Sequence, residues 1–216
     1  MSKKGKEKVV ELKQSVTITP PNFGLAQLTL VGTAPLVLHR FFKKAEIMAT
    51  HQAGSQQAKK GKKKDPRNFE AEYESAKHIS EDGWAGVPAA AFRKGMISAC
   101  RIIGFKMTLA KLGVFIKADG VEREDGQPLV RITKGKPEMN VSPVRNATGV
   151  IDLRARPMWR TWEIDVVIEF DADMFTLQDV VNLMSRVGSQ VGIGEGRPDS
   201  KSSAGVGWGT FKVKGG

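Results

Sequence analysis

Six glycines, with Arg197 and Lys201 among them, occur in one short stretch, Ser189 to Val213, which reads SQVGIGEGRPDSKSSAGVGWGTFKV. An ordered glycine costs backbone entropy, so this cluster indicates special φ and ψ angles or a close approach of the backbone to another group. Outward-facing backbone N–H groups beside Arg197 and Lys201 suit a chain of phosphates. We therefore expect a loop whose backbone lies against a phosphate chain, built on Gly192, Gly194, Gly196, Gly205, Gly207 and Gly209.

The position of this loop excludes two common phosphate-binding motifs. A dinucleotide-binding loop follows a strand and opens a helix, whereas these glycines follow a helical pattern and lead into a strand. A P-loop, with Gly-Lys-Ser/Thr at the start of a helix, is absent as well. The alternative is a glycine hairpin without a ligand, but a hairpin turn needs about two glycines and not this many. We favour the phosphate-binding interpretation.

Basic charge is concentrated in particular segments of the chain, whose 216 residues carry a net charge of +11. Residues 1–20 hold five Lys and two Glu (+3), and residues 40–67 hold nine Lys or Arg and two acids (+7). Residues 131–160 hold seven bases and two acids (+5), whereas residues 161–180 hold six acids and no base (−6). A polyanion is the natural partner for such a pattern. A merely solvated loop explains KKGKKKDPR equally well.

Hydrophobic periodicity predicts the elements that position these groups. Residues 161–171, TWEIDVVIEFD, alternate between apolar and mostly acidic positions and form the clearest predicted strand. A helix over 176–188 begins with a Thr cap and ends at a glycine, and another begins at Pro88 and closes at Gly104. We also expect a strand over 25–38 with a break after Gly32, a short helix over 69–79, a strand over 111–120 and a final strand in WGTFKV.

This order of elements predicts one domain of the α+β class. Stripped of insertions it is strand, helix, strand, strand, helix, strand, which is the ferredoxin-like β-α-β-β-α-β plan. We expect a basic N-terminal arm over 1–20 and a single domain over 21–216, with the glycine-rich loop before its last strand. Large basic insertions then fall at about 40–80, as a mobile Lys-rich loop, and at 121–160, as a thumb-like segment.

Three stretches of the sequence resemble the RAMP superfamily, which contains the backbone subunits and crRNA-processing nucleases of CRISPR systems. TLVGTAPLVLH is similar to the first strand and following turn of that group, and GVPAAAFRKGMISACR is similar to its helix entry. GIGEGRPDSKSSAGVGWGTFKV resembles its terminal glycine-rich loop and strand. The segment PAAAF departs from the family, which often has Ser at this point. The overall likeness is to phage and prophage proteins that carry nearly the text QVGIGEGRPDSK.

The resemblance implies that copies of the protein coat a single strand of DNA or RNA side by side, as a homo-oligomer or helical filament. The segment 121–160 matches the protruding insertion of the backbone subunits, and its RARPMWR run interleaves arginines with Trp159, which suits phosphate pairing and base stacking. Trp159 taken alone is more typical of a core residue. We expect the strand to contact Arg40, Lys43, Lys44, Lys59, Lys60, Lys62, Lys63, Lys64, Arg93, Lys94, Arg145, Arg154, Arg156, Trp159, Arg160, Gly192, Gly194, Gly196, Arg197 and Lys201.

The three histidines, His39, His51 and His78, do not predict a catalytic or metal site. His39 lies near the place where RAMP processing nucleases carry a catalytic histidine, and beside Arg40 it offers a base and a cation for phosphodiester cleavage. The same residues equally suit a solvated strand end, which we favour. His51 falls in the predicted mobile loop and His78 on a charged helix, without a second ligand at metal spacing. We expect no cofactor.

These features together predict a non-catalytic single-stranded nucleic-acid-binding protein, encoded by a phage and acting in recombination, replication or defence. The alternatives are a RAMP-type endoribonuclease and a phage structural or assembly protein. Cys100 is the only cysteine, which excludes an intrachain disulfide and fits a reducing compartment. The charged N-terminal segment lacks the apolar core of a signal peptide, and no apolar run is long enough to span a membrane, so we expect a cytoplasmic protein.

Overall fold

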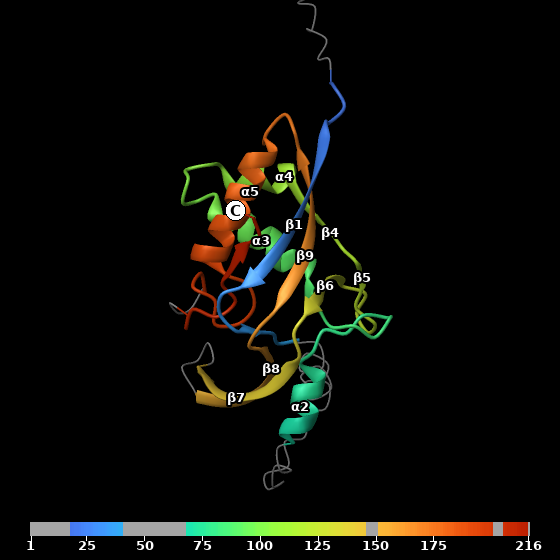
Figure 1. Ribbon diagram of the computed structural model, residues 1–216, viewed down its shortest axis with the longest axis vertical. Helices are drawn as coiled ribbons and strands as arrows, with labels where there is room; N and C mark the ends of the chain where they lie inside the picture. The colour runs from blue at the N-terminus through green and yellow to red at the C-terminus, as the bar shows by residue number, and fades with distance from the viewer. Residues whose placement is uncertain (1–17, 41–67, 146–150, 201–204, 216) are drawn as a thin grey trace, which may run out of the picture.

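The computed structural model describes residues 18–40, 68–145, 151–200 and 205–215, with the elements shown in Figure 1. Several predictions concern positions outside these ranges, including most of the N-terminal arm and the Lys-rich loop. The predicted contact residues that lie outside them are Lys43, Lys44, Lys59, Lys60, Lys62, Lys63, Lys64 and Lys201.

Two long antiparallel strands, β1 (Phe23–Gly32) and β9 (Glu163–Asp171), form the centre of the main sheet. β10 (Phe211–Val213) pairs with the other edge of β1. The free edge of β9 is shared along its length by β4 (Val114–Lys117) and β6 (Pro128–Lys134). β6 then pairs with two short strands, β3 (Gly86–Pro88) and β5 (Gly120–Val121).

The alternating pattern of β9 fixes which face of this sheet is buried. Its apolar positions, including Ile164 and Val166, are fully covered, while its acidic positions face the other side. The register pairs Leu30 with Ile164 and Leu28 with Val166, so both central strands present apolar side chains to the same face. The predicted strand over 161–171 is confirmed because strict alternation requires one buried and one solvated face.

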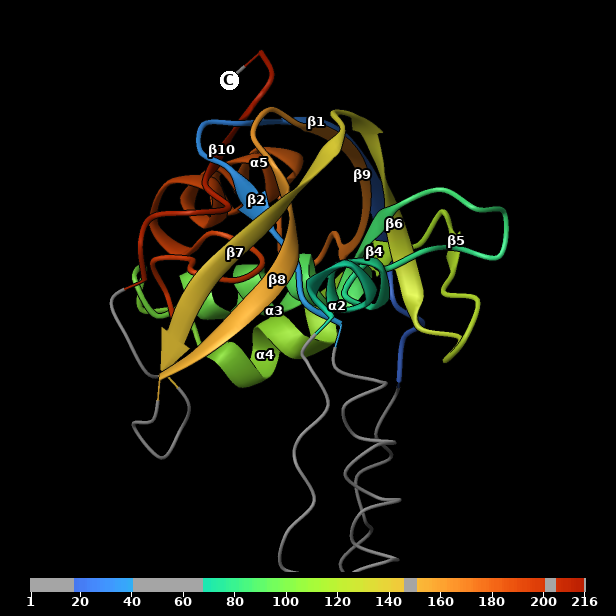
Figure 2. The same cartoon turned by 90° about the horizontal axis from the view of Figure 1, so that it is seen from below.

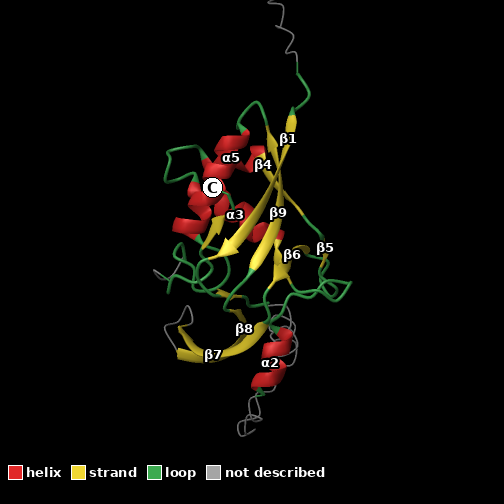
Figure 3. Ribbon diagram, viewed as in Figure 1, coloured by secondary structure: helices red, strands yellow, loops and turns green. Residues whose placement is uncertain are grey.

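Two helices cover that apolar face, α3 (Ala89–Ala99) and α5 (Leu177–Arg186), and Figure 3 shows both on one side of β1 and β9. Their buried side chains, such as Phe92 and Met184, belong to the same hydrophobic core as the strands. α5 begins at the predicted Thr176, whose hydroxyl accepts from the backbone N–H of Asp179 in a capping box. It continues into a π-helical turn over Val187–Val191, from which the glycine-rich loop starts.

A second, three-stranded sheet lies beyond one end of the main sheet. The long hairpin of β7 (Pro137–Arg145) and β8 (Ile151–Trp159) pairs with β2 (Leu36–Val37). α2 (Phe69–Ser75) lies against this hairpin, as Figure 2 shows from below, and the Tyr73 hydroxyl donates to the carbonyl of Pro137 at 3.1 Å. The hairpin is therefore tied to the body of the protein at its base.

The structure confirms the α+β class and corrects several details of the predicted elements. The helix that begins after Pro88 ends at Ala99, short of Gly104, and the unpredicted helix α4 (Met107–Gly113) follows. Within the segment 121–160, which was predicted as an insertion, β6 joins the main sheet and β8 pairs with β2. None of the helices among the described residues is both long enough and apolar enough to cross a membrane.

Trp159 belongs to the core, as the alternative interpretation of this residue held. Only 1% of its surface is exposed, and it pairs with Leu36 across β8 and β2. Its ring is therefore not available for stacking on bases, and the residue ties the hairpin to the rest of the fold.

Replacing Trp159 tests this place in the core. We expect Trp159→Ala to lower the free energy of unfolding by about 3–5 kcal/mol, because a buried indole is lost and a cavity remains. Arg160→Ala changes the next residue, whose side chain is 68% exposed, and should cost less than about 1 kcal/mol. Urea unfolding of both variants gives the two values, and similar losses would contradict the assignment.

Candidate nucleic-acid interface

The glycine-rich loop is ordered by its own unusual backbone conformations. All six predicted glycines have positive φ, a region that residues with a side chain rarely adopt. Hydrogen bonds within the loop hold it closed: Ile193 N–H donates to Gly209 O at 3.0 Å, and Val206 N–H donates to Gly196 O at 2.9 Å. The expectation of special backbone angles is confirmed.

The close approach at Gly194 is to the protein's own backbone. A Cβ atom built there would lie 2.5 Å from the carbonyl oxygen of Val37, nearer than any real side chain comes. The next residue donates its N–H to the same oxygen, Glu195 N to Val37 O at 2.8 Å, and Gly209 N–H donates to Pro35 O at 2.7 Å. Packing against β2 therefore accounts for this glycine without a phosphate.

The loop and α3 enclose a cleft of about 690 Å³, which we call the α3 cleft. One wall is the loop from Val191 to Glu195 with Arg197 and Asp199, and the opposite wall is one face of α3 from Pro88 to Ser98. The third wall consists of the segment that follows β2 together with His78, Asp125 and Gln127. Lys94, Arg197, His39, Gly192 and Gly194, which the sequence singled out, all line it.

The face of α3 in the cleft carries small side chains, which leave its backbone within reach of a ligand. Ala90, Ala91, Gly95 and Ser98 recur at helical spacing, and Lys94 stands among them. No side chain caps the start of this helix, and its first turn has no acidic residue. The N–H groups of a first helical turn have no partner within the helix and favour an anion.

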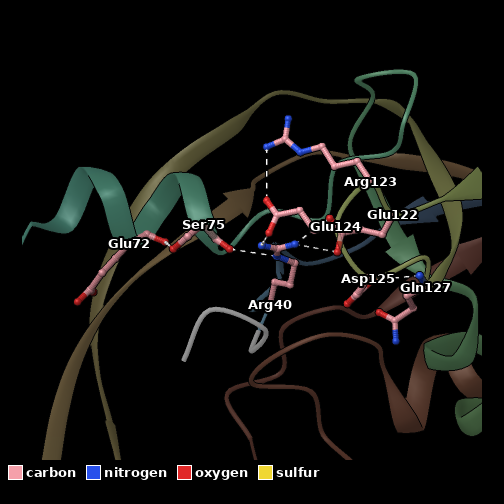
Figure 4. A network of polar contacts seen from close by, with 8 residues as sticks. All are labelled: Arg40, Glu72, Ser75, Glu122, Arg123, Glu124, Asp125 and Gln127. Atoms are coloured by element: carbon pink, nitrogen blue, oxygen red, sulfur yellow. Dashed lines mark hydrogen bonds and ion pairs between the residues drawn. The ribbon is translucent and has the colours of Figure 1, made fainter. Parts of the chain in front are cut away.

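Arg40 does not face a ligand, because its guanidinium belongs to a buried polar network (Figure 4). It donates to both carboxylate oxygens of Glu122 at 2.9 Å, to Glu124 at 2.6 Å and to the carbonyl of Ser75 at 3.3 Å. Burial alone would lower the pKa of Arg40, but the hydrogen bonds to the two carboxylates outweigh it and raise the pKa. Arg40 therefore holds the wall of the α3 cleft in place and is removed from the predicted contacts.

The arginines of the predicted thumb are also largely covered. Arg156 is 4% exposed, and it lies 3.5 Å from the Glu195 carboxylate and donates to the Ser142 hydroxyl at 2.7 Å. Arg154 pairs with Asp152 at 3.4 Å, and its side chain is 11% exposed. Arg156 therefore joins the hairpin to the glycine-rich loop, and Arg154 forms an ion pair within the hairpin. Neither side chain presents its charge to a nucleic-acid strand.

Other predicted contact residues lie outside the α3 cleft. Arg93 donates to the carbonyls of Val114 and Lys111 and lies over the ring of Phe115, with 4.8 Å to the ring centroid. Arg160 is exposed and pairs with Glu138 at 2.8 Å. A Cβ at Gly196 would meet the Trp208 ring at 2.8 Å, so that glycine supports the loop. Arg145 is the last residue of β7, in the hairpin.

Asp199 anchors the far side of the loop to α3. Its carboxylate accepts from the Ser98 hydroxyl and from Arg101, at 2.7 and 2.8 Å for the two oxygens. The hydrogen bond from Ser98 is the main cause of the lowered pKa of Asp199, with Arg101 contributing further. The carboxylate thus stays ionised and holds the loop across the end of the cleft.

His78 is the functional candidate that the sequence did not indicate. It follows α2 rather than lying within it, is 7% exposed and lines the α3 cleft. Its Nδ1 atom is buried and finds no hydrogen-bond partner among the residues that the structure describes. Burial, and secondarily the charge of Arg40, lowers the pKa of His78 to about 4, against a small opposing effect of Asp125.

Comparison with known proteins identifies no family for this chain. No protein-family model matches the chain, and a search of curated proteins finds no match. Within the described ranges, no group of three or more His, Cys, Asp or Glu side chains is placed to hold a metal ion.

Two alanine variants separate the conformational cost of the loop from its close approach to β2. Gly194 and Gly207 have similar φ, +73° and +79°, but a Cβ at Gly207 meets nothing within 4 Å. Both alanines carry the left-handed strain of about 1–2 kcal/mol, and only Gly194→Ala also collides with the Val37 carbonyl. We expect Gly194→Ala to lower the melting temperature by about 4–8 °C more than Gly207→Ala. Equal melting temperatures would show that the loop does not depend on this contact.

The neutral state of His78 makes stability depend on pH. A histidine whose pKa is lowered on folding, here from 6.5 to about 4, stabilises the fold above its unfolded pKa. This contribution is lost as the pH falls from 6.5 towards 4. We expect the wild type to lose up to about 3 kcal/mol more over this window than His78→Phe, which cannot titrate. Urea unfolding at a series of pH values measures the difference, and parallel curves would refute it.

Proposed function

We propose that this protein binds single-stranded nucleic acid through the α3 cleft, without cleaving it. The observation that carries the proposal is the meeting of Lys94, Arg197 and the uncapped first turn of α3 in one open cleft of about 690 Å³. A lysine ammonium group, an arginine guanidinium group and the N–H groups of a first helical turn can together bind phosphate oxygens. The overall charge of +11 supports a polyanionic partner.

The acidic groups around the cleft do not cancel this attraction, because most of them already have partners. Glu195 lies beside Arg156, and Asp199 is bound by Arg101 and Ser98. Lys94 is exposed and, within the part of the chain that the structure describes, forms no ion pair. Its ammonium group is thus the principal charge on α3 that faces the cleft.

We also propose that the core is ferredoxin-like. Taking β10, β1, β9 and β4 as the four core strands gives an antiparallel sheet in which α3 connects β1 to β4 and α5 connects β9 to β10. This order agrees with the split β-α-β arrangement expected for the β-α-β-β-α-β plan. The other strands would then be additions to this core.

The proposed relationship to the RAMP superfamily has one support in the structure. The three stretches that resemble the family, 29–39, 86–101 and 192–213, each contribute residues to the α3 cleft. On that basis we propose that copies of a phage-encoded protein assemble side by side along the strand as a homo-oligomer or filament. Size-exclusion chromatography with and without the strand measures this assembly.

A second candidate function, RNA cleavage, is favoured by one observation. His39 and His78 come from distant parts of the chain and line the same cleft. Phosphodiester cleavage needs a base and stabilisation of the developing charge, and Lys94 is placed in the same cleft for the second task. We rank this function below binding because the low pKa of His78 makes it a weak base.

Binding is tested by fluorescence anisotropy with single- and double-stranded DNA and RNA of one sequence. We expect tighter binding of single strands, with log affinity falling by about 0.7 per contacted phosphate for each unit of log salt concentration. Lys94→Ala should weaken binding about three- to tenfold and reduce the salt slope by about 0.7. Lys212→Ala removes an equal charge from the exposed side of β10, outside the cleft, and should change little.

An equal loss of affinity in Lys94→Ala and Lys212→Ala would show that binding depends only on the overall charge of the protein. An affinity that does not change with salt concentration would contradict binding to the phosphates of a nucleic-acid strand. The same RNA samples, analysed on denaturing gels, report cleavage. Product that forms with the wild type and disappears with His39→Ala would favour the nuclease instead.

A further inference from the structure

The helix α4 and the turn before it expose a group of aliphatic side chains. Five large apolar residues are exposed over residues 101–112: Ile102, Ile103, Met107, Leu109 and Leu112. Leu112 is 67% exposed, whereas Ala110 and Gly113 are the buried residues of this helix. Single exposed apolar residues are ordinary, but a contiguous group marks a surface to which another molecule binds.

This group continues onto the neighbouring elements. A Cβ atom at Gly113, the last residue of α4, would lie 3.1 Å from the sulfur of Met174. Phe115, which follows in β4, contacts the half-exposed Phe23 edge to face, with 5.9 Å between the ring centroids. Figure 1 shows α4 and the start of β1 towards the end of the molecule opposite the hairpin. We call residues 102–113 and 171–177 together with Phe23 the end surface.

The end surface carries charged side chains of both signs. Lys106 and Lys111 are exposed on α4, and the exposed Asp173 precedes Met174, at the contact with Gly113. Within the part of the chain that the structure describes, neither Lys111 nor Asp173 forms an ion pair. Opposite charges therefore lie close to the same contact without neutralising each other inside one copy.

This combination of groups suits a second copy of the protein. A nucleic-acid strand stacks its bases on aromatic rings, whereas α4, MTLAKLG, is aliphatic. Carboxylates on the same surface would repel phosphates and the anionic head groups of a membrane. In a twofold contact the surface meets itself, so that each contact of residue i with residue j occurs twice. A surface that carries both signs around an apolar centre is then complementary to itself.

We propose that two copies of the protein form a twofold dimer through the end surface, with the aliphatic side chains of α4 at its centre. Lys111 of each copy then pairs with Asp173 of the other. The end surface reaches the lower end of the about 20–30 residues per side that stable interfaces use. The dimer forms without nucleic acid, so it goes beyond the proposed binding at the α3 cleft and does not rest on it.

Light scattering after size-exclusion chromatography, without nucleic acid and at a series of protein concentrations, measures the dimer. The mass of the wild type should approach twice the 23.6 kDa of one chain as the concentration rises. Leu112→Glu places a charge at the centre of the contact and should raise the dimer dissociation constant at least about tenfold. Ile151→Glu makes the same change in the hairpin, at a residue that is 60% exposed, and should leave the constant unchanged.

An exchange of charges tests the pairing between copies. Lys111→Glu and Asp173→Lys each place like charges opposite one another, so each should weaken the dimer about three- to tenfold. A mixed dimer of the two variants has opposite charges at both contacts. An equimolar mixture should therefore dimerise more tightly than either variant alone, with a dissociation constant near the wild-type value.

A wild type that keeps the mass of one chain at every concentration overturns the inference, as do equal dissociation constants for Leu112→Glu and Ile151→Glu. A monomeric wild type whose melting temperature falls on Leu112→Glu would show instead that the same chain covers the end surface. If Leu112→Glu does not fold, the two charge variants decide. A mixture that dimerises no better than each variant alone overturns the twofold contact.

Discussion

The contact between the glycine-rich loop and the two-residue strand β2 is the constraint on which the rest of the structure depends. One edge of β2 pairs with β8, so that Leu36 lies opposite Trp159. The carbonyls of Pro35 and Val37 accept hydrogen bonds from the loop. Because β2 is joined on both sides, it fixes the hairpin and the loop relative to the main sheet. Only glycine at position 194 allows the two backbones to come this close.

This arrangement determines what the cleft can present to a ligand. The segment that leaves β2 carries His39 and Arg40 into the wall, and the buried ion pair with Glu122 holds it there. A buried pair contributes little net stability but is costly to break, so it serves to fix geometry. The basic side chains that line the cleft without an ion pair among the described residues are Lys94 and Arg197, and Arg197 also donates to the carbonyl of Gly194 at 2.9 Å.

The same sheet directs the acidic residues of β9 away from the helices. The apolar residues of β9 must face α3 and α5, and strict alternation therefore sends Glu163, Asp165 and Glu169 to the opposite face. Lys117 and Lys134 neutralise part of that face through ion pairs with Glu169 and Glu163.

Periodicity and capping residues in the sequence were enough to predict those elements that depend on residues close together in the chain. The strand over 161–171, the helix that starts at Thr176 and the cluster of positive-φ glycines all follow from local chemistry. The helix α4 was missed because the predicted strand overlapped it, and the end of α3 was misplaced because Gly104 lies beyond a short linking turn.

The roles of single charged and aromatic side chains were decided only by the tertiary structure. A basic pattern cannot show that Arg40 finds its carboxylate 82 residues away, in Glu122. Nor can an arginine–tryptophan run show that Trp159 turns into the core. His78 became a candidate because it is buried, lies near Arg40 and lines the cleft. Burial and pairing depend on residues far apart in the chain, and the sequence pattern around one residue does not contain them.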